Sequence, residues 1–415
     1  MESQSIRLTT YQFRLLAVLA LVNFVNFADR QVVVPLLPLL RQQMGVTDSQ
    51  LGSLQTWLLV VLAVASIPSG FLADRFSQTR IIVGGVVFWS LATIACGFAP
   101  TYLILVVARS LIGVGEAAYA PAAQSMISDS FPQERRAMAQ SVFASGMLLG
   151  GAAGLAVGGV IGAAHGWKYT FIFVGLFCLI PGVFALKLQE PPRRPRSEVV
   201  PLKTLLSVPA YLAMIAAGTF ITFASVSLLY WGVDFAVTYK GFSLHQASES
   251  LAAVALLSLV FGVLTGGIVA DRLQKKFIYG RIVVIAAAFL CAAPFVLLAI
   301  QSDEKWVVLA GLFIAGFFMS WYHGPVTAVL HDLTPQRAHA TAIGVYMFVT
   351  QLLGALGPQL VGKISDASDL QLGLQVAVAV MVGGSLLMFL VIYFIRRDGL
   401  HHPRLAAFHS EAAYD

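Results

Sequence analysis

Length, composition and charge restrict the protein to one broad class. The chain has 415 residues, of which 58% are hydrophobic and only 11% are charged. Because charged residues make up about a quarter of an ordinary soluble domain, this composition excludes a soluble protein and predicts a polytopic membrane protein.

Twelve apolar runs, separated by charges, prolines and glycines, are each long enough to cross a bilayer. The chain is therefore predicted to be an all-α membrane protein with twelve transmembrane helices in two pseudo-symmetric six-helix bundles. The predicted spans are 14–40, 49–73, 80–99, 101–128, 136–163, 167–188, 208–237, 245–270, 279–300, 304–332, 337–364 and 370–396.

The first span contains an unusual concentration of polar side chains. Both asparagines of the sequence, Asn23 and Asn26, precede the adjacent charges Asp29 and Arg30. Charged side chains inside a membrane are costly and are functional by default. The alternative is a structural ion pair between helices. No small-residue cleavage site follows this run, so we interpret it as a transmembrane helix rather than a removable signal peptide.

Cysteine and asparagine usage gives information about location and cofactors. Cys96, Cys178 and Cys291 all fall in apolar runs, which favours packing over a disulfide framework or a metal cluster. No Asn-x-Ser/Thr sequon occurs. We therefore expect no cofactor and no metal, and the simplest location is a bacterial inner membrane.

The net charge of +6 is explained by topology. Alternating the loops between two sides places 19 of the 26 Lys and Arg residues on the side of both termini and five on the other, with Arg30 and Arg109 inside the membrane. Basic residues concentrate in cytoplasmic loops, so both termini are predicted to be cytoplasmic. The charge does not imply a nucleic-acid partner.

The longest hydrophilic segment divides the chain into two halves. We predict an N-terminal bundle at 1–188, a cytoplasmic linker at 189–204, a C-terminal bundle at 205–400 and a cytoplasmic tail at 401–415. Residues 70–75 recur as residues 267–272, and residues 129–133 resemble residues 332–336, at offsets of 197 and 203. Parallel repeats with a site between them are the basis of alternating access.

The first repeated segment predicts a latch at the cytoplasmic ends of spans 2 and 8. In this hypothesis Gly70 and Gly267 allow tight turns, and the following acids accept hydrogen bonds from backbone amides of the next helix or pair with a basic residue. A topological charge anchor explains one copy but not two. The predicted gating residues are Asp74, Arg75, Asp271 and Arg272.

Counting residues along the helices places two acids at the same depth. Asp29 and Glu116 each lie about fifteen residues into their spans, roughly 22 Å at 1.5 Å per residue. Arg109 precedes Glu116 by seven residues, on the same face. Two acids and two arginines could exchange partners when a proton binds, although a packing role for Arg109 is the alternative.

The second half has no acid or base at the corresponding depth. Polar and aromatic side chains are the candidates for binding substrate there, and packing is the alternative for each of them. These candidates are Thr222, Ser225, Tyr230 and Trp231 in span 7, and Trp321, Tyr322 and His323 in span 10.

Span 5 has glycine at every fourth position from Gly146 to Gly162, which predicts a bare ridge along one face. Such ridges allow helix backbones to approach closely. Span 8 has a pair of glycines at the same spacing, Gly262 and Gly266.

Several motifs resemble those of a known family. The Asp-Arg pattern after span 2 is similar to that of the major facilitator superfamily, and nearly the whole chain resembles the spinster family of lipid transporters. The motifs that carry this resemblance are Asn26-Phe27-Ala28-Asp29-Arg30, Leu54-Gln55-Thr56, the segment 84–91, Gly113-Val114-Gly115-Glu116-Ala117-Ala118-Tyr119, the segment 190–193, the segment 337–342, Leu352-Leu353-Gly354 and Ile364-Ser365-Asp366.

The resemblance implies the major facilitator superfamily fold, coupling through Asp29 and Glu116, and a lysophospholipid or sphingolipid substrate. It also implies that the glycine ridge of span 5, with Gly154 near its centre, faces span 8 at Gly262 and Gly266. The ridge would then act as a sliding surface in gating, or as static packing. We expect a proton-coupled secondary transporter, active as a monomer among membrane lipids, and not an enzyme. Exporters of apolar drugs and carriers of small organic anions are the alternatives. The predicted substrate-binding residues are Asn26, Arg30, Arg109, Tyr119, Tyr230, Trp231, Trp321, Tyr322 and His323.

Overall fold

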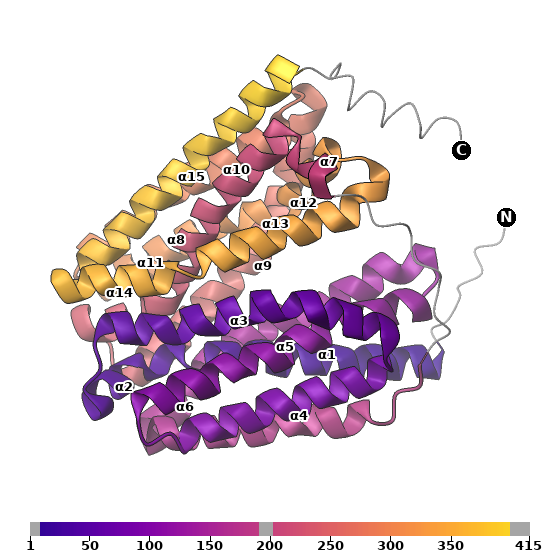
Figure 1. The fold of residues 1–415 in the computed structure, drawn as a ribbon. Coiled ribbons are helices and arrows are strands. Elements are labelled where there is room, and N and C mark those ends of the chain that lie inside the picture. Colours follow the sequence, from indigo (N-terminus) through magenta and orange to yellow (C-terminus); the bar gives the residue numbers. More distant parts are fainter. Residues whose placement is uncertain (1–8, 191–201, 399–415) are drawn as a thin grey trace. The chain divides into compact units, whose positions relative to one another are not determined.

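The computed structural model describes residues 9–190 and 202–398, which are almost entirely helical (Figure 1). The predicted tail at 401–415 and most of the predicted linker at 189–204 lie outside the described residues. The helices are α1 Thr10–Gln31, η1 Val34–Leu36, α2 Leu37–Met44, α3 Asp48–Arg75, α4 Gln78–Gly97, α5 Tyr102–Ser130, α6 Gln133–Ala185, α7 Leu202–Leu206, α8 Pro209–Tyr239, α9 Leu244–Lys276, α10 Gly280–Gln301, α11 Lys305–Met319, η2 Ser320–Tyr322, α12 His323–Leu333, η3 Gln336–Ala338, α13 His339–Gly354, α14 Gly357–Ala367 and α15 Leu370–Asp398.

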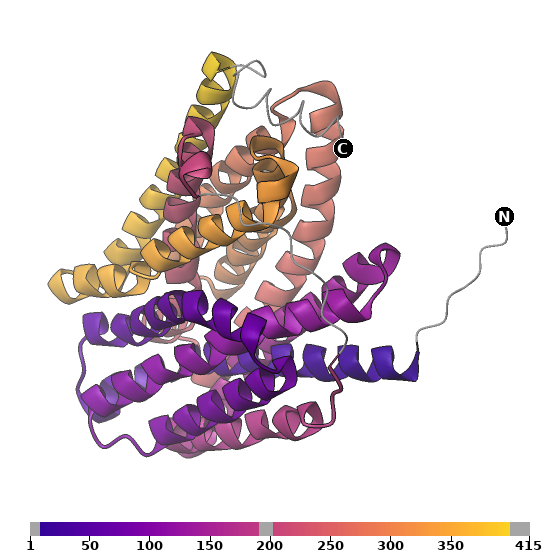
Figure 2. The same cartoon turned by 45° about the vertical axis from the view of Figure 1, so that its right-hand side comes forward.

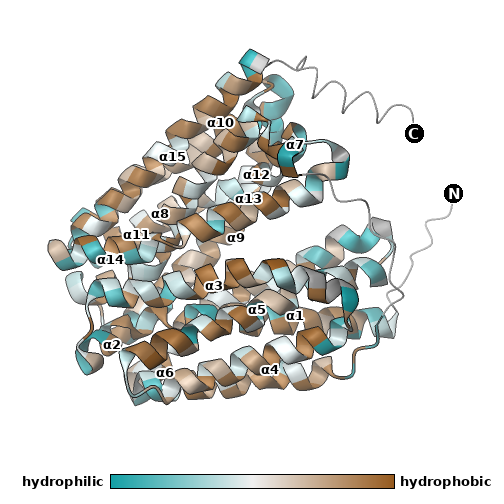
Figure 3. Ribbon diagram, in the orientation of Figure 1, coloured by the Kyte–Doolittle hydropathy of each residue, from teal (hydrophilic) through white to brown (hydrophobic). Residues whose placement is uncertain are grey.

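The predicted transmembrane spans are confirmed in number and approximate position. Eleven helical stretches of the described chain are long and apolar enough to cross a membrane. One of them, Met138–Ala185, has 48 residues and is interrupted at Gly166, whose φ of 80° ends one helix and allows the next to begin. It therefore supplies two spans. Figure 3 shows hydrophobic residues along the lengths of these helices.

The chain forms two compact units. The first comprises Met1–Val46, Trp57–Pro195 and Ser243–Ala252, and the second comprises Thr47–Thr56, Arg196–Phe242 and Ala253–Asp415. The start of α3 thus belongs to the second unit. There the Asp366 carboxylate accepts hydrogen bonds from the amides of Asp48 and Ser49, at 2.8 and 3.0 Å, and so caps the first turn of α3. Figure 2 gives a second view of the helices.

The predicted first span is broken into helices α1, η1 and α2. Pro35 lies in η1 and has no amide hydrogen to continue the α-helical pattern. The last α-type bond at the end of α1 runs from the Val32 amide to the Ala28 carbonyl, and the Leu36 amide then bonds to Val33. The break falls directly after Asp29 and Arg30, which therefore lie in the last turn of α1.

The glycine ridge of α6 packs against α1. A Cβ atom added at Gly146, Gly150, Gly154 or Gly158 would lie 2.1–2.8 Å from a backbone carbonyl oxygen of α1 or of the turn after it. The expectation that Gly154 faces span 8 is therefore wrong, because its position is filled by the carbonyl of Ala28. Because the ridge carries no side chains, the backbones of α1 and α6 come into direct contact within the first unit.

The glycines of span 8 pack within the second unit. A Cβ atom at Gly262 would meet the carbonyl of Phe317, and one at Gly266 would meet Trp321. Where α6 does contact α9, the contact is at Gly159, which faces Ser248. The ridge and the span 8 glycines therefore serve two separate close contacts rather than one shared surface.

We expect Gly154→Ala to destabilise the protein by about 1–3 kcal/mol, the usual cost of overpacking. The added methyl group would lie 2.2 Å from the Ala28 carbonyl oxygen, which belongs to the backbone and cannot rotate away. Thermal unfolding in detergent measures this cost.

Gly151→Ala is the matched control on the same helix, since its Cβ would make only an ordinary contact with Gln31 at 3.8 Å. It should leave the unfolding temperature unchanged or slightly raised, because alanine favours helix. Equal unfolding temperatures for the two variants would contradict the close contact of α1 with α6.

Candidate functional site

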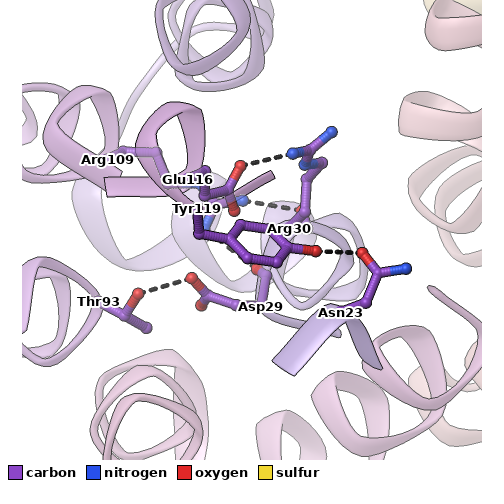
Figure 4. A network of polar contacts seen from close by, with 7 residues as sticks. All are labelled: Asn23, Asp29, Arg30, Thr93, Arg109, Glu116 and Tyr119. Carbon is purple, nitrogen blue, oxygen red and sulfur yellow. Dashed lines mark hydrogen bonds and ion pairs between the residues drawn. The ribbon is translucent and has the colours of Figure 1, made fainter. Parts of the chain in front are cut away.

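Polar and charged side chains from three helices meet inside the first unit (Figure 4). They come from the second half of α1, from α4 and from the middle of α5, in stretches that are otherwise apolar. These residues are Asn23, Asn26, Asp29 and Arg30 on α1, Thr93 on α4, and Arg109, Glu116 and Tyr119 on α5. The predicted coincidence in depth of the two acids is thus supported by side chains that contact one another.

An ion pair joins α1 to α5. The Nη2 atom of Arg30 lies 2.7 Å from Oε2 of Glu116, and the Glu116 side chain is fully buried whereas that of Arg30 is 15% exposed. The Arg30 guanidinium also lies over the Phe27 ring, 4.7 Å from its centroid. The amide of Asn26 lies beside the Glu116 carboxylate. Charge-assisted contacts of this kind are short and strong, so the pair fixes the spacing of the two helices.

Arg109 binds backbone rather than a carboxylate. Its Nη2 donates to the carbonyl of Arg30 at 2.9 Å and its Nη1 to that of Asp29 at 3.4 Å, and the side chain is fully buried. These carbonyls belong to the last turn of α1, where intrahelical donors run out and a cation is favoured by the helix dipole. Arg109 therefore caps the C-terminus of α1.

Asp29 is held by a hydroxyl group. Oγ1 of Thr93 lies 2.7 Å from Oδ2 of Asp29 and 3.0 Å from the carbonyl oxygen of Trp89, one turn earlier on α4. Asp29 and Thr93 are both fully buried. The two acids of the site are therefore treated differently, since Glu116 contacts a cation and Asp29 contacts a neutral donor.

Tyr119 and Asn23 extend the group toward the N-terminus of α1. The Tyr119 hydroxyl donates to Oδ1 of Asn23, whose Nδ2 donates to the carbonyl of Phe143 on α6 at 2.8 Å. The ring of Trp89 packs edge-on against Tyr119, with centroids 5.4 Å apart. Tyr119 thus has its polar atom engaged and its ring packed, which supports a positioning role.

Five polar atoms of the site have no hydrogen-bond partner among the described residues, and all are buried. They are Nδ2 of Asn26, Oδ1 of Asp29, Nε of Arg30, Nε of Arg109 and Oε1 of Glu116. Buried polar atoms are normally satisfied. The site can therefore form further hydrogen bonds, to water or to a polar group of a ligand, and its carboxylate oxygens can also take up a proton.

Two candidates of the second half, Tyr230 and Trp231, are closed to solvent. The Tyr230 hydroxyl donates to the carbonyl of Leu51 at 2.6 Å, and Nε1 of Trp231 donates to that of Pro358 at 3.0 Å. Their relative exposures are 2% and 0%. These contacts lie within the second unit and favour the packing alternative for both residues.

The candidates of span 10 are more open. Trp321 donates from Nε1 to Oγ1 of Thr265 at 3.1 Å, and the hydroxyls of Tyr322 and Tyr346 are hydrogen bonded to each other. His323 directly follows Tyr322 as the first residue of α12, and its side chain is exposed. Of the second-half candidates, His323 is thus the best placed to meet a ligand.

The repeated acids of the second half meet at one arginine. Arg281, near the start of α10, lies 3.3 Å from Asp271 through Nη2 and 2.9 Å from Asp332 through Nη1. Of the two predicted partners for Asp271, backbone amides of the next helix or a basic residue, the structure shows the basic residue. Asp271 is the repeat of Asp74 and Asp332 is the repeat of Asp129, so both repeated motifs serve a single contact at this end of the second unit.

The predicted turns at Gly70 and Gly267 are wrong. Both glycines lie inside helices, α3 and α9, and neither has a positive φ. The Asp74 side chain lies outside the described part of the structure, whereas Arg75 and Arg272 are exposed. At the start of α4, the amides of Thr79 and Arg80 bond to Glu190 and Ser77, at 3.1 and 3.2 Å.

Counting residues from the ends of the predicted spans found most of the site, but Thr93 and Asn23 were not among the predicted site residues. Thr93 lies about as far into span 3 as Asp29 lies into span 1, so the same count applied to hydroxyl groups could have found it. Asn23 is visible in the polar stretch, but its partner Tyr119 depends on helix rotation. The acceptors of Arg109 are backbone carbonyls, which every residue type has, so the sequence does not indicate them.

The family model described as Major Facilitator Superfamily matches residues 19–358 and 279–410, which together cover most of the chain. The protein therefore belongs to the major facilitator superfamily and is a transporter.

Within that superfamily its relatives include spinster proteins. Protein spinster homolog 1 of Bos taurus is 29% identical over 85% of this chain and 72% of its own length. The sphingosine-1-phosphate transporter SPNS2 of Danio rerio is 28% identical over 84% of this chain and 75% of its own. An MFS-type efflux pump of Mycolicibacterium smegmatis is 25% identical over 93% and 94% of the two chains.

The fold agrees with a solved transporter. A crystal structure of a bacterial homolog to the human lysosomal transporter spinster, in an inward-facing and occupied conformation, has a TM-score of 0.84 with 21% identity, covering 94% of this chain and 99% of that one. The expectations of a twelve-helix superfamily fold and of a transporter resembling the spinster family are confirmed.

The Arg30–Glu116 pair predicts that its two single variants lose different amounts of stability. Removing the cation with Arg30→Met leaves a buried carboxylate without its partner, which costs about 3–5 kcal/mol in comparable pairs. Glu116→Gln should cost less, since the Arg30 side chain is partly exposed. The double variant should be more stable than Arg30→Met alone. Unfolding in detergent measures all three.

Glu249→Gln is the control for the loss of one carboxylate charge. Glu249 is about half exposed and faces His245 one turn away, so the change should cost no more than about 0.5 kcal/mol. A double variant as unstable as the sum of the two single variants would contradict a direct Arg30–Glu116 interaction.

Proposed function

We propose that the protein is a proton-coupled secondary transporter that moves an amphipathic lipid, a lysophospholipid or sphingolipid, across the membrane by alternating access. The observation that carries this proposal is the group formed by the buried residues Asp29, Arg109 and Glu116 together with Arg30, whose side chain is 15% exposed. Helix packing alone does not require two acids and two arginines in one apolar bundle.

The arrangement suits an exchange of partners. Glu116 holds Arg30 while it is ionised, and its protonation would release the guanidinium. Arg30 is the more accessible of the two arginines, because Arg109 is fully buried and engaged with backbone. A guanidinium binds phosphate oxygens through two parallel hydrogen bonds. Arg30 is therefore the proposed partner of an anionic head group, with Asn26 beside it, and Arg109 supports this position from behind.

The lipid substrate is supported by the relatives. One of them is named as a transporter of sphingosine-1-phosphate, which combines a phosphate head with an apolar chain. A basic group within an apolar bundle matches both parts of such a molecule. His323, Trp321 and Tyr322 are proposed as further contacts, since their side chains are not closed off as those of Tyr230 and Trp231 are.

A second candidate function is export of apolar drugs. The efflux pump of Mycolicibacterium smegmatis matches this chain over a larger share of both lengths than the spinster relatives do. Carriage of small organic anions would also use Arg30. Competition experiments separate these possibilities, because a lysolipid, an apolar cation and a small carboxylate should inhibit uptake to different extents.

Location and gating complete the proposal. From the distribution of Lys and Arg we place both termini in the cytoplasm of a bacterial cell, with a monomer in the inner membrane. The Asp271–Arg281–Asp332 contact, together with Arg272 and the corresponding Asp74 and Arg75, is proposed to act as a latch that is remade in each transport cycle. Gly154 is proposed to act indirectly, by holding α1 firmly on α6.

Uptake of a labelled lysophospholipid into proteoliposomes tests the function directly. We expect accumulation that depends on an imposed pH gradient and that is inhibited by unlabelled lysolipid more strongly than by a small carboxylate. Equal uptake into protein-free liposomes would contradict transport. Stronger inhibition by an apolar cation, with no effect of lysolipid, would favour drug export.

Asp29→Asn keeps the shape of the side chain and removes its ability to change charge. We expect this variant to fold and to bind lipid, but to show no accumulation above the level reached without a pH gradient. Glu116→Gln should weaken coupling in the same direction. Asp303→Asn, at a side chain that is 95% exposed, is the control. Full gradient-driven uptake by Asp29→Asn would exclude coupling at this residue.

The latch predicts a change in rate without a change in affinity. Asp271→Asn removes one of the two acids that hold Arg281, so the maximal rate of uptake should change while half-saturation stays within a few fold. Asp303→Asn again serves as the control, because it removes an exposed acid that pairs with Lys240, outside the repeated motifs. If both variants transport at the wild-type rate, the Asp271 contact has no gating role.

A further inference from the structure

Thr93 has two acceptors for a single proton. Its hydroxyl oxygen lies 2.7 Å from Oδ2 of Asp29 and 3.0 Å from the carbonyl oxygen of Trp89, and the side chain is fully buried on α4. A hydroxyl group donates one hydrogen bond and accepts up to two. At any moment Thr93 can therefore donate to only one of these two oxygens, and it can still accept a bond from a third group.

The two donor arrangements correspond to the two charge states of Asp29. When Asp29 is ionised, the Thr93 hydroxyl donates to its carboxylate, a charge-assisted bond. When Oδ2 carries a proton, the acid donates to Oγ1 of Thr93, and the hydroxyl hydrogen turns to the Trp89 carbonyl. Every group keeps a partner in both states, and only a hydroxyl hydrogen has to rotate.

The other carboxylate oxygen of Asp29 has no such arrangement. Oδ1 is buried and has no hydrogen-bond partner among the described residues. A proton on Oδ1 would be a buried donor with nothing to accept it, which is costly. The contact with Thr93 therefore favours Oδ2 as the atom that gains and loses the proton.

We propose that Thr93 is a positioning residue that holds the Asp29 carboxyl group in one place through both of its protonation states. This inference rests on the proposed role of Asp29 in proton coupling and adds to it the residue that makes the exchange possible without movement of the acid. The only side chain to which the Thr93 hydroxyl is hydrogen bonded among the described residues is that of Asp29, whereas Glu116 is paired with Arg30.

Other charged and titratable groups also surround Asp29. Arg109 and Glu116 face it from α5, and Arg30 is its neighbour on α1. Cys96 on α4 and Cys178 on α6 are close enough to interact with it electrostatically. All of these remain unchanged when only the Thr93 hydroxyl is removed, so a variant at Thr93 isolates one hydrogen bond.

Thr93→Val removes the hydroxyl and keeps the shape, and Thr93→Ser keeps the hydroxyl. In Thr93→Val the ionised acid loses a charge-assisted bond, whereas the protonated acid loses a weaker neutral one. The pH at which uptake is half-maximal should therefore move to higher pH by about one unit, a tenfold change in proton affinity. Thr93→Ser should retain the wild-type pH profile.

The infrared band of the protonated carboxyl group gives a second reading that does not depend on transport. Asp29→Asn identifies the band, and its titration in detergent should shift to higher pH in Thr93→Val and not in Thr93→Ser. Thr93→Ala replaces the valine variant if the latter does not fold. This reading stays valid even if the substrate is not a lipid.

The outcomes separate the two proposals. Wild-type titration of the Asp29 band in both Thr93→Val and Thr93→Ala would overturn the role of Thr93, as would equal shifts in Thr93→Ser and Thr93→Val. Gradient-driven uptake by Asp29→Asn would instead overturn proton coupling at Asp29, whatever the Thr93 variants show. A shift in Thr93→Val with an unchanged Thr93→Ser supports the inference.

Discussion

The contact on which the site depends is the capping of α1 by Arg109. A fully buried guanidinium is costly in an apolar bundle unless its charge and donors are used. Here it donates to the carbonyls of Asp29 and Arg30, where α1 ends before Pro35. The same contact gives Nη1 and Nη2 of the arginine their acceptors and gives the two carbonyls at the helix terminus a donor. It also fixes the depth at which the side chains of Asp29 and Arg30 lie. Their contacts with Thr93 and Glu116 depend on that depth.

The two acids are then distinguished by their partners. Glu116 contacts a cation, and its charge is balanced as long as Arg30 stays in place. Asp29 contacts the Thr93 hydroxyl, a partner that can act as donor or acceptor. An ion pair responds to protonation by separating, whereas a hydroxyl contact responds by reversing its direction. Under the proposed proton coupling, the two acids would therefore have separate tasks, one coupled to movement of Arg30 and the other to storage of a proton.

Much of the fold and part of the site could be predicted from the sequence, because both depend on distance along single helices. Apolar length gave the spans, and counting residues from the ends placed Asp29, Arg30 and Glu116 together. Contacts that depend on helix rotation could not be derived in this way. Spacing showed that the glycines of span 5 share a face, but not that the face meets α1. Likewise, the sequence of Tyr230 and Trp231 does not reveal that backbone carbonyls occupy their polar atoms.

The ridge of α6 has a consequence for how this protein can tolerate change. The atoms that a new side chain at Gly146, Gly150 or Gly154 would meet are backbone oxygens of Ala20, Phe24 and Ala28. A clash with a side chain can be relieved by a smaller residue at the partner position, but every residue type has the same carbonyl. Second-site suppressors on the facing surface of α1 are therefore excluded in principle. Reversion, or a shift of the whole helix, is the remaining way to restore the contact. Substitutions of these glycines are therefore hard to compensate by a change elsewhere on α1.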